Sequence, residues 1–155
     1  MSKKALITGI GGQDGPYLAK LLLERGYSVV GVRRPESINS SIGLQFLGIE
    51  GRVHHEAVDM TNALSVRELL QKHKPDEIYN LSSQSSVGLS FKQPHETMSA
   101  NIMSVLNILE NVRTHFPQCR IYQASSSEMF GRVPVAALPI TENSIPAPSS
   151  PYAVS

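Results

Sequence analysis

The stretch KALITGIGGQDG, residues 4–15, decides the fold class of this chain. Its first five residues form a short apolar run that ends at a glycine, which predicts a buried strand. The segment Asp14–Arg25 then changes to a helical period, with leucines on one face, an aspartate suited to the helix N-terminus and Pro16 in the first turn. A buried strand that turns through glycines into an amphipathic helix is typical of the first unit of an α/β sheet.

Strand and helix patterns continue to alternate after this unit. Runs rich in β-branched and aromatic residues predict four more strands, at Ser28–Val32, Val53–Val58, Glu77–Leu81 and Arg120–Ala124. Between them we expect a loop with one helical turn over residues 35–51, a helix capped by Thr61 or Asn62, and a helix whose apolar stripe from Met98 to Val112 is most simply core. This order predicts an α/β fold of the Rossmann type, a doubly wound parallel sheet with helices on both faces. The proline-rich stretch 134–151 is expected to be irregular, so residues 1–155 are interpreted as one domain.

The composition excludes several classes of partner. The chain has 14 basic and 13 acidic residues and a net charge of +1, which favours neither nucleic acid nor an anionic membrane. No apolar run approaches the length of about 20 residues that spans a bilayer, and the N-terminus lacks the features of a signal peptide. A single cysteine, Cys119, excludes an internal disulfide. We therefore expect a cytoplasmic protein with no nucleic-acid partner and no membrane partner.

The glycine turn between the first strand and the first helix suits a dinucleotide. Gly9 allows the tight turn, Gly12 lets the backbone approach a pyrophosphate, and Gly15 lets the helix pack closely on the sheet. Gln13 and Asp14 complete the turn, and the helix N-terminus offers N–H groups and a partial positive charge to the phosphates. We predict that these five residues bind the cofactor; the alternative is an ordinary glycine-rich turn.

Two arginines close the second strand, roughly 20 residues after the glycines. An acidic residue at this place would bind the ribose 2′-hydroxyl of NAD, whereas the guanidinium groups of Arg33 and Arg34 suit a 2′-phosphate. We therefore predict NADP as the cofactor; the alternative is a solvated pair at a strand end. Asp59 and Met60 follow the third strand and are predicted to contact the adenine, although Asp59 could instead cap the next helix.

Serine-rich segments follow the fourth and fifth strands, at the strand ends where such folds bind ligands. We predict that Leu81, Ser83 and Ser85 lie beside the nicotinamide-side ribose and phosphate; the alternative is a serine-rich turn. Ser126 and Glu128 point the same way if the chain stays extended, which makes them a candidate proton-transfer pair. The alternative for this pair is the start of a helix.

No metal site is predicted from the histidines. His54 and His55 are neighbours on a strand and face opposite ways, so they are poorly placed to share an ion. His73 and His115 lie near helix C-termini, where they favour the helix dipole. We therefore expect that the five histidines do not cluster.

Five stretches combine into a recognisable pattern. They are TGIGGQDG at 8–15, the arginine pair at 33–34, PDEIYNL at 75–81, YQASSSEMFG at 122–131 and SPYAV at 150–154. Together they resemble the extended short-chain dehydrogenase/reductases that act on nucleotide sugars, and most closely the family of GDP-mannose 4,6-dehydratases.

The resemblance implies a role for each matching residue. Tyr152 matches the tyrosine that takes the proton of the sugar C4 hydroxyl as hydride leaves C4, and Ser126 matches the residue that hydrogen-bonds the same oxygen. Glu128 matches the carboxylate that removes the C5 proton and assists loss of water from C6, after which NADPH returns the hydride to C6. Asn101 matches an asparagine common in the group. The implied partners are GDP-mannose or a related nucleotide sugar, and a second copy of the chain in a homo-oligomer.

Two other functions stay open. The chain could be a GDP-sugar reductase or epimerase of the same group, although simple epimerases usually lack the Glu128 carboxylate, or a non-catalytic NADP-binding module. In the family the tyrosine belongs to a Tyr-x-x-x-Lys motif whose lysine would directly follow Ser155. We therefore expect the 155 residues to be an N-terminal part, without the substrate-binding C-terminal part, that has no turnover on its own.

Overall fold

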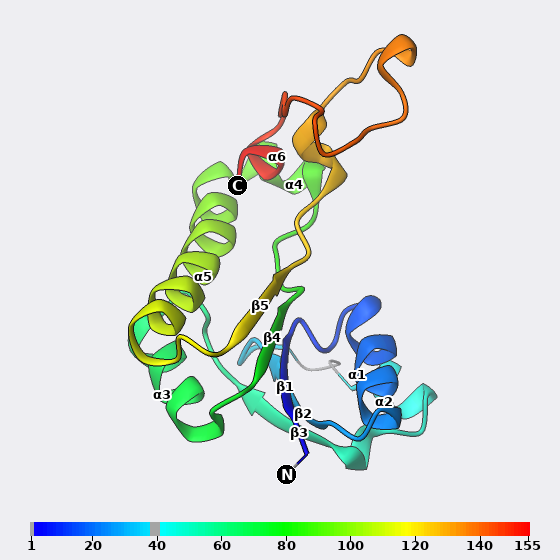
Figure 1. Cartoon of the computed structure of the whole chain (residues 1–155). Helices are drawn as coiled ribbons and strands as arrows, with labels where there is room; N and C mark the ends of the chain where they lie inside the picture. The colour runs from blue at the N-terminus through cyan, green and yellow to red at the C-terminus, as the bar shows by residue number, and fades with distance from the viewer. Residues whose placement is uncertain (1, 38–40) are drawn as a thin grey trace.

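The computed structural model describes residues 2–37 and 41–155. A parallel sheet with the order β3-β2-β1-β4-β5 forms the centre of the molecule (Figure 1). Its strands are Lys4–Thr8 (β1), Ser28–Arg33 (β2), Val53–Ala57 (β3), Glu77–Asn80 (β4) and Arg120–Gln123 (β5). The predicted Rossmann-type fold is confirmed, and each predicted strand ends within one residue of the observed strand.

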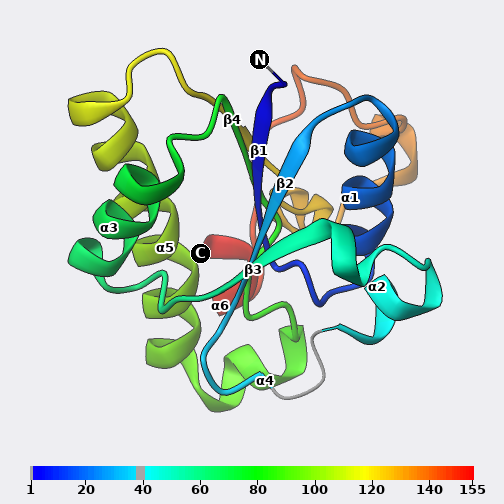
Figure 2. The ribbon, with the colours of Figure 1, turned by 90° about the horizontal axis from the view of Figure 1, so that it is seen from below.

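Helices cover both faces of this sheet. Helices α1 (Asp14–Glu24) and α2 (Ile42–Phe46) lie on one side, and α3 (Ala63–His73) and α5 (Pro94–His115) lie on the other (Figure 2). Asn62 caps α3, since its side-chain oxygen accepts a hydrogen bond of 3.0 Å from the backbone N–H of Ser65. The shorter elements are α4 (Val87–Lys92), α6 (Pro151–Val154) and the 3₁₀ turns η1 (Glu50–Arg52), η2 (Ser127–Phe130) and η3 (Val135–Ala137).

Strand β1 divides the hydrophobic core into two layers, because successive side chains point to opposite faces. Ala5 and Ile7 belong to the layer beneath α1, and Leu6 belongs to the layer beneath α3 and α5. These side chains are fully buried, and burying a side chain the size of leucine stabilises the fold by about 1.5–3 kcal/mol. The glycine turn is therefore anchored between two packed layers.

Helix α5 turns a mostly polar face toward the rest of the molecule. Asn101, Ser104 and Asn107 are buried, and the Asn107 side-chain amide donates a hydrogen bond of 3.0 Å to the backbone carbonyl of Met60. Ile102 and Leu106 are instead more than 40% exposed. The expectation that the whole stripe from Met98 to Val112 is core is therefore wrong for its middle part, because buried amides and hydroxyls find hydrogen-bond partners on the inner face.

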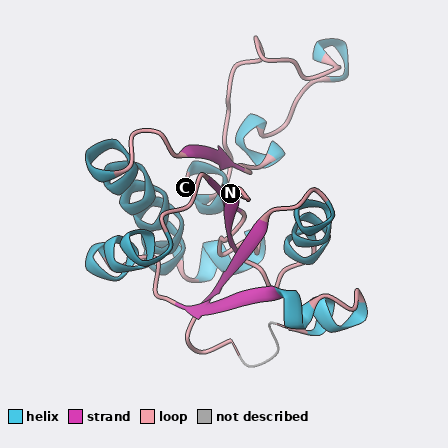
Figure 3. Ribbon diagram, turned by 60° about the horizontal axis from the view of Figure 1, so that its bottom comes forward, coloured by secondary structure: helices cyan, strands magenta, loops and turns pink. Residues whose placement is uncertain are grey.

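Between η2 and α6 the chain leaves the sheet as an arm with little regular structure (Figure 3). This confirms the expectation for residues 134–151, apart from η3 and the first residue of α6. Within residues 2–37 and 41–155, no helix is both long enough and apolar enough to cross a membrane.

Candidate functional site

A cavity of about 620 Å³ opens at the carboxyl ends of the strands. It lies where the strand order reverses between β1 and β4, which is the place where open α/β sheets bind ligands. We call it the glycine cleft. All the residues that the sequence predicted for cofactor binding line it: Gly9, Gly12, Gln13, Asp14, Gly15, Arg33, Arg34, Asp59, Met60, Leu81, Ser83 and Ser85.

The glycine turn leaves no room for side chains at its two ends. Gly9 has a φ of +71°, and a Cβ atom there would lie 3.0 Å from the backbone of Leu81 and Ser82. A Cβ atom on Gly15 would lie 2.7 Å from the carbonyl oxygen of Gly9 and 2.8 Å from the Cα of Ile10. Backbone atoms cannot give way as a flexible side chain can, so both positions require glycine.

Helix α1 begins directly behind this turn. Gln13 precedes the helix without a side-chain hydrogen bond to it, and Asp14 lies in the first turn. The first N–H groups of a helix have no partner within the helix. Gln13, Asp14 and Gly15 line the glycine cleft, so this uncapped helix end borders the cleft and suits an anionic group such as a phosphate.

The arginine pair lies at the end of β2. Arg34 is exposed, and the guanidinium of Arg33 donates from Nη1 to the backbone carbonyls of Arg34, Pro35 and Ser37 at 3.2–3.3 Å. These bonds hold Arg33 against its own loop at the wall of the glycine cleft. Ser37, which sequence reasoning missed, lines the cleft beside them.

Asp59 and Met60 line the glycine cleft from the connection between β3 and α3. The Asp59 carboxylate accepts hydrogen bonds from the backbone N–H of Thr61 at 2.9 Å and from its hydroxyl at 2.7 Å. The alternative in which Asp59 caps the next helix is wrong, because Asn62 is the cap. Met60 is buried, whereas Asp59 is exposed and carries a polar group.

A chain of hydrogen bonds across three strand ends supports the loop after β4. The buried Thr8 hydroxyl donates to the side-chain oxygen of Asn80 and accepts from the backbone N–H groups of Leu81 and Ser82, both at 3.2 Å. The Asn80 amide donates to the side-chain oxygen of Gln123 at 2.7 Å. Sequence reasoning missed this network, whose signal in the sequence was a polar residue at the last position of each of three strands.

A second cavity of about 390 Å³ adjoins the first. We call it the tyrosine cleft, because Tyr152 of α6 lines it together with Ser126 at the start of η2. The segment Leu81–Ser83 belongs to the linings of both cavities. The structure thus brings two of the three predicted catalytic residues to one cleft, which borders the glycine cleft along a shared loop.

Glu128 is placed differently from what the sequence suggested. The chain does not stay extended after Ser126 but enters η2, where the Ser126 hydroxyl accepts a hydrogen bond of 3.2 Å from the backbone N–H of Glu128. The Glu128 side chain is exposed and is absent from the described linings of the two clefts. The assumed extended backbone is therefore wrong, and the alternative of a helix start describes the segment better.

Asn101 forms hydrogen bonds with one lining residue of each cleft. Its side-chain oxygen accepts a hydrogen bond of 2.8 Å from the backbone N–H of Gln84, and its amide donates to the hydroxyl of Ser155 at 2.9 Å. The residue is buried on α5. It therefore positions both the loop after β4 and the end of α6, a role that the match of Asn101 to an asparagine common in the family group did not specify.

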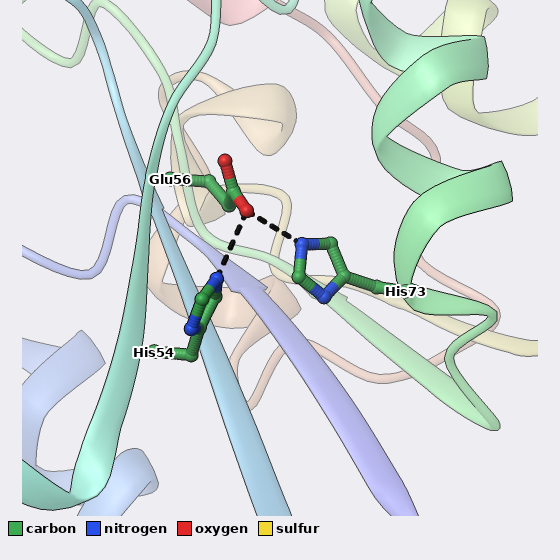
Figure 4. A group of neighbouring side chains, drawn as sticks. All are labelled: His54, Glu56 and His73. Carbon is green, nitrogen blue, oxygen red and sulfur yellow. Dashed lines mark hydrogen bonds and ion pairs between the residues drawn. The ribbon is translucent and has the colours of Figure 1, made fainter.

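Three side chains form a separate polar group between β3 and α3, which we call the histidine cluster: His54, Glu56 and His73 (Figure 4). One carboxylate oxygen of Glu56 receives the Nε2 atoms of His54 at 3.0 Å and His73 at 2.7 Å, and the Lys72 ammonium at 2.7 Å. Burial disfavours the charged carboxylate, but these three hydrogen bonds outweigh it and lower the pKa of Glu56 to about 2. The expectation that the histidines do not cluster is wrong for His54 and His73, because tertiary packing brings the end of α3 to β3.

The comparisons with known proteins agree with one another on the family. The family model for GDP-mannose 4,6 dehydratase matches residues 6–155. A GDP-mannose 4,6-dehydratase of Vibrio cholerae is 39% identical over 161 residues, which cover 99% of this chain and 43% of that protein. GDP-mannose 4,6 dehydratase 1 of Arabidopsis thaliana is 40% identical, covering 99% of this chain and 44% of the relative. The chain thus spans less than half the length of the curated relatives it matches.

Solved structures of other proteins share the fold of this chain. A UDP-glucose 4-epimerase from Thermotoga maritima with UDP-glucose aligns with a TM-score of 0.84 at 25% identity, over 97% of this chain and 47% of the epimerase. A UDP-glucose 4-epimerase from Brucella ovis in complex with NAD aligns with a TM-score of 0.83 at 23% identity, over 99% of this chain and 44% of the epimerase. The second likeness concerns the fold alone.

Proposed function

The chain belongs to the GDP-mannose 4,6-dehydratase family, and on that premise we propose that it is the cofactor-binding part of an enzyme that converts GDP-mannose to GDP-4-dehydro-6-deoxy-mannose. The observation that supports this most is the shared wall of the two clefts. A dinucleotide in the glycine cleft and a sugar in the tyrosine cleft would meet beside Leu81–Ser83, which line both cavities. Hydride transfer needs such close neighbours.

The residues of the glycine cleft fit a dinucleotide, because its crowded glycine positions and uncapped helix end suit a pyrophosphate. We assign the pyrophosphate to the turn from Gly9 to Gly15, the 2′-phosphate of NADP to Arg33 and Arg34, and the adenine to Asp59 and Met60. Leu81, Ser83 and Ser85 would border the nicotinamide-side ribose. When bound, NADP would accept a hydride from the sugar and return the same hydride within one turnover.

The side chains at the tyrosine cleft would act in proton transfer and hydrogen bonding. Tyr152 would accept the proton of the C4 hydroxyl as that carbon is oxidised, while the Ser126 hydroxyl donates a hydrogen bond to the same oxygen. Glu128 would remove the C5 proton and pass it to the departing C6 hydroxyl, which leaves as water. Since Glu128 lies outside the cleft, this role requires η2 to rearrange when the sugar binds.

The reaction can be tested by mass balance. We expect the 155-residue chain to bind NADP without turnover, and a form extended after Ser155 by the C-terminal part of the Vibrio cholerae relative to convert GDP-mannose to a product lighter by one water. The concentration of NADPH should not change, because the hydride returns. A product of unchanged mass would indicate an epimerase, a consumption of NADPH would indicate a reductase, and binding without any product would indicate a non-catalytic module.

The tyrosine gives a matched variant for this assay. In the extended form, Tyr152→Phe should lower the rate of dehydration by about 100-fold or more, since it removes the hydroxyl of the general base. Its affinity for NADP should change little, because Tyr152 does not line the glycine cleft. An extended Tyr152→Phe protein with full activity would contradict the assignment.

We also infer that the protein forms a homo-oligomer through α5. Ile102, Leu106 and Leu109 form an exposed apolar row, each with more than 40% of its surface accessible, and they also line the tyrosine cleft, so a second copy on α5 would close this side of the cleft. Association with a second copy would remove this row from water. Sedimentation velocity of the wild-type chain and of Leu106→Ser should show a larger species only for the wild type.

A further inference from the structure

The histidine cluster is built by the packing of an edge strand against a helix end. His54 and Glu56 are two residues apart on β3 and therefore share one face. They lie in register with Val30 and Val32 of β2, whose side chains belong to the core layer beneath α3. His73 ends α3 and reaches the same place from the opposite side (Figure 4).

The side chains converge on a single point. Both imidazoles direct Nε2 at the same oxygen of Glu56, and the ligand atoms of the three residues all lie within 4.8 Å of one another. The His54 and His73 rings are 5.1 Å apart between centroids, at a tilt of 55°. Neither the cofactor nor the reaction proposed above uses any of these residues.

We propose that His54, Glu56 and His73 form a binding site for a divalent transition-metal ion of the zinc type. Two imidazoles and one carboxylate are ligands that zinc prefers, and three protein ligands leave a coordination position for water. Imidazole also suits copper and nickel, whereas calcium and magnesium prefer oxygen alone. The residues thus select a class of cation.

The cluster must rearrange by up to about an ångström to accept the ion, because its three ligand atoms now lie within 4.8 Å of one another. Ligands around a tetrahedral zinc lie about 3.4 Å apart, which follows from bonds of about 2.1 Å. The oxygen of Glu56 must therefore move a few tenths of an ångström away from the two imidazole nitrogens, which now lie at 3.0 and 2.7 Å. His54 can follow this shift because 59% of its side-chain surface is exposed, whereas His73 is held in the core layer with 9% exposed.

The ion would replace the imidazole N–H groups and the Lys72 ammonium as the partners of the Glu56 carboxylate. Each Nε2 must give up its proton to bind the ion, and each ring is then neutral with its single proton on Nδ1. The Lys72 ammonium must also withdraw, and it can do so because 61% of its side-chain surface is exposed. Lys72 is therefore a competitor of the metal, and its removal should strengthen binding.

The experiment is a zinc titration of the full 155-residue chain by calorimetry, with the matched variants His54→Asn and His55→Asn. His55 is exposed and lies next to His54 on β3 but on the other face, so it shares the surroundings and cannot share the ion. We expect one ion per wild-type chain, an affinity lowered at least about 10-fold by His54→Asn, and no change from His55→Asn. Lys72→Met should raise the affinity by about twofold to fivefold.

Two results would overturn the site. One is the lack of one-to-one zinc binding by the wild-type chain; the other is binding that His54→Asn leaves intact or that both histidine variants weaken equally. His54 is exposed, so its substitution leaves the fold in place, which circular dichroism checks. His73→Asn provides a second variant that must weaken binding in the same way.

Discussion

In the glycine turn, backbone atoms set the geometry, whereas in the histidine cluster charged side chains set it. The turn consists of consecutive residues, and Gly9 and Gly15 lie against other main-chain atoms at 2.7–3.1 Å from where a Cβ would stand. The cluster joins residues from β3 and α3 that are held by hydrogen bonds to one carboxylate. The turn should therefore be insensitive to pH and intolerant of added volume, while the cluster should tolerate volume and respond to protons and cations.

The largest effect is expected at Gly15. A methyl group there meets the backbone of Gly9 and Ile10, so Gly15→Ala should lower the free energy of unfolding by about 2–3 kcal/mol and abolish NADP binding. Urea denaturation and a NADP titration measure both. Gly88→Ala is the control: it adds the same methyl in α4, where nothing lies within 4 Å, and should stabilise the chain by about 0.5–1 kcal/mol. Equal stability of the two variants would contradict the idea that backbone contacts define the turn.

A smaller effect is expected at Arg33, where the glycine cleft depends on a side chain. Arg33→Ala should weaken NADP binding by about 10-fold, since it removes one of the two guanidinium groups that would donate hydrogen bonds to the 2′-phosphate. Binding of NAD, which lacks that phosphate, should hardly change. Arg25→Ala, at the far end of α1, should leave both affinities as they are. Equal losses for NADP and NAD would show that Arg33 supports the loop through its bonds to the carbonyls of residues 34, 35 and 37 instead.

The same contrast explains what the sequence could predict. The strands and the glycine turn follow from local patterns, because periodicity and glycine spacing act over a few residues. The rest depends on contacts between distant segments. Helix α5 buries its amide side chains and exposes apolar ones in its middle part, contrary to expectation. The turn η2 ends the extended backbone after Ser126, so Glu128 does not point the same way as Ser126. His54 and His73 lie on different elements, and no local pattern could place them on one carboxylate.

The smallest effect is expected in the histidine cluster, and it carries the pH dependence that the turn lacks. The pKa of Glu56 falls from its ordinary value of 4.5 to about 2 in the folded chain, so ionised Glu56 stabilises the fold above pH 4.5. This contribution decreases as the pH falls through about 2, where the folded carboxylate becomes protonated. With a chelator present, Glu56→Gln should therefore lower the free energy of unfolding by about 1 kcal/mol at pH 7, a modest value because Lys72 and His54 are largely exposed. Urea denaturation from pH 7 downward should show the two proteins converge below pH 4.5.

Glu110→Gln is the control, since the exposed Glu110–Arg113 pair at 2.8 Å should contribute little at any pH. A wild-type advantage that persists unchanged near pH 2 would mean that the carboxamide disturbs packing, and that the cluster, like the turn, is held by shape and not by charge.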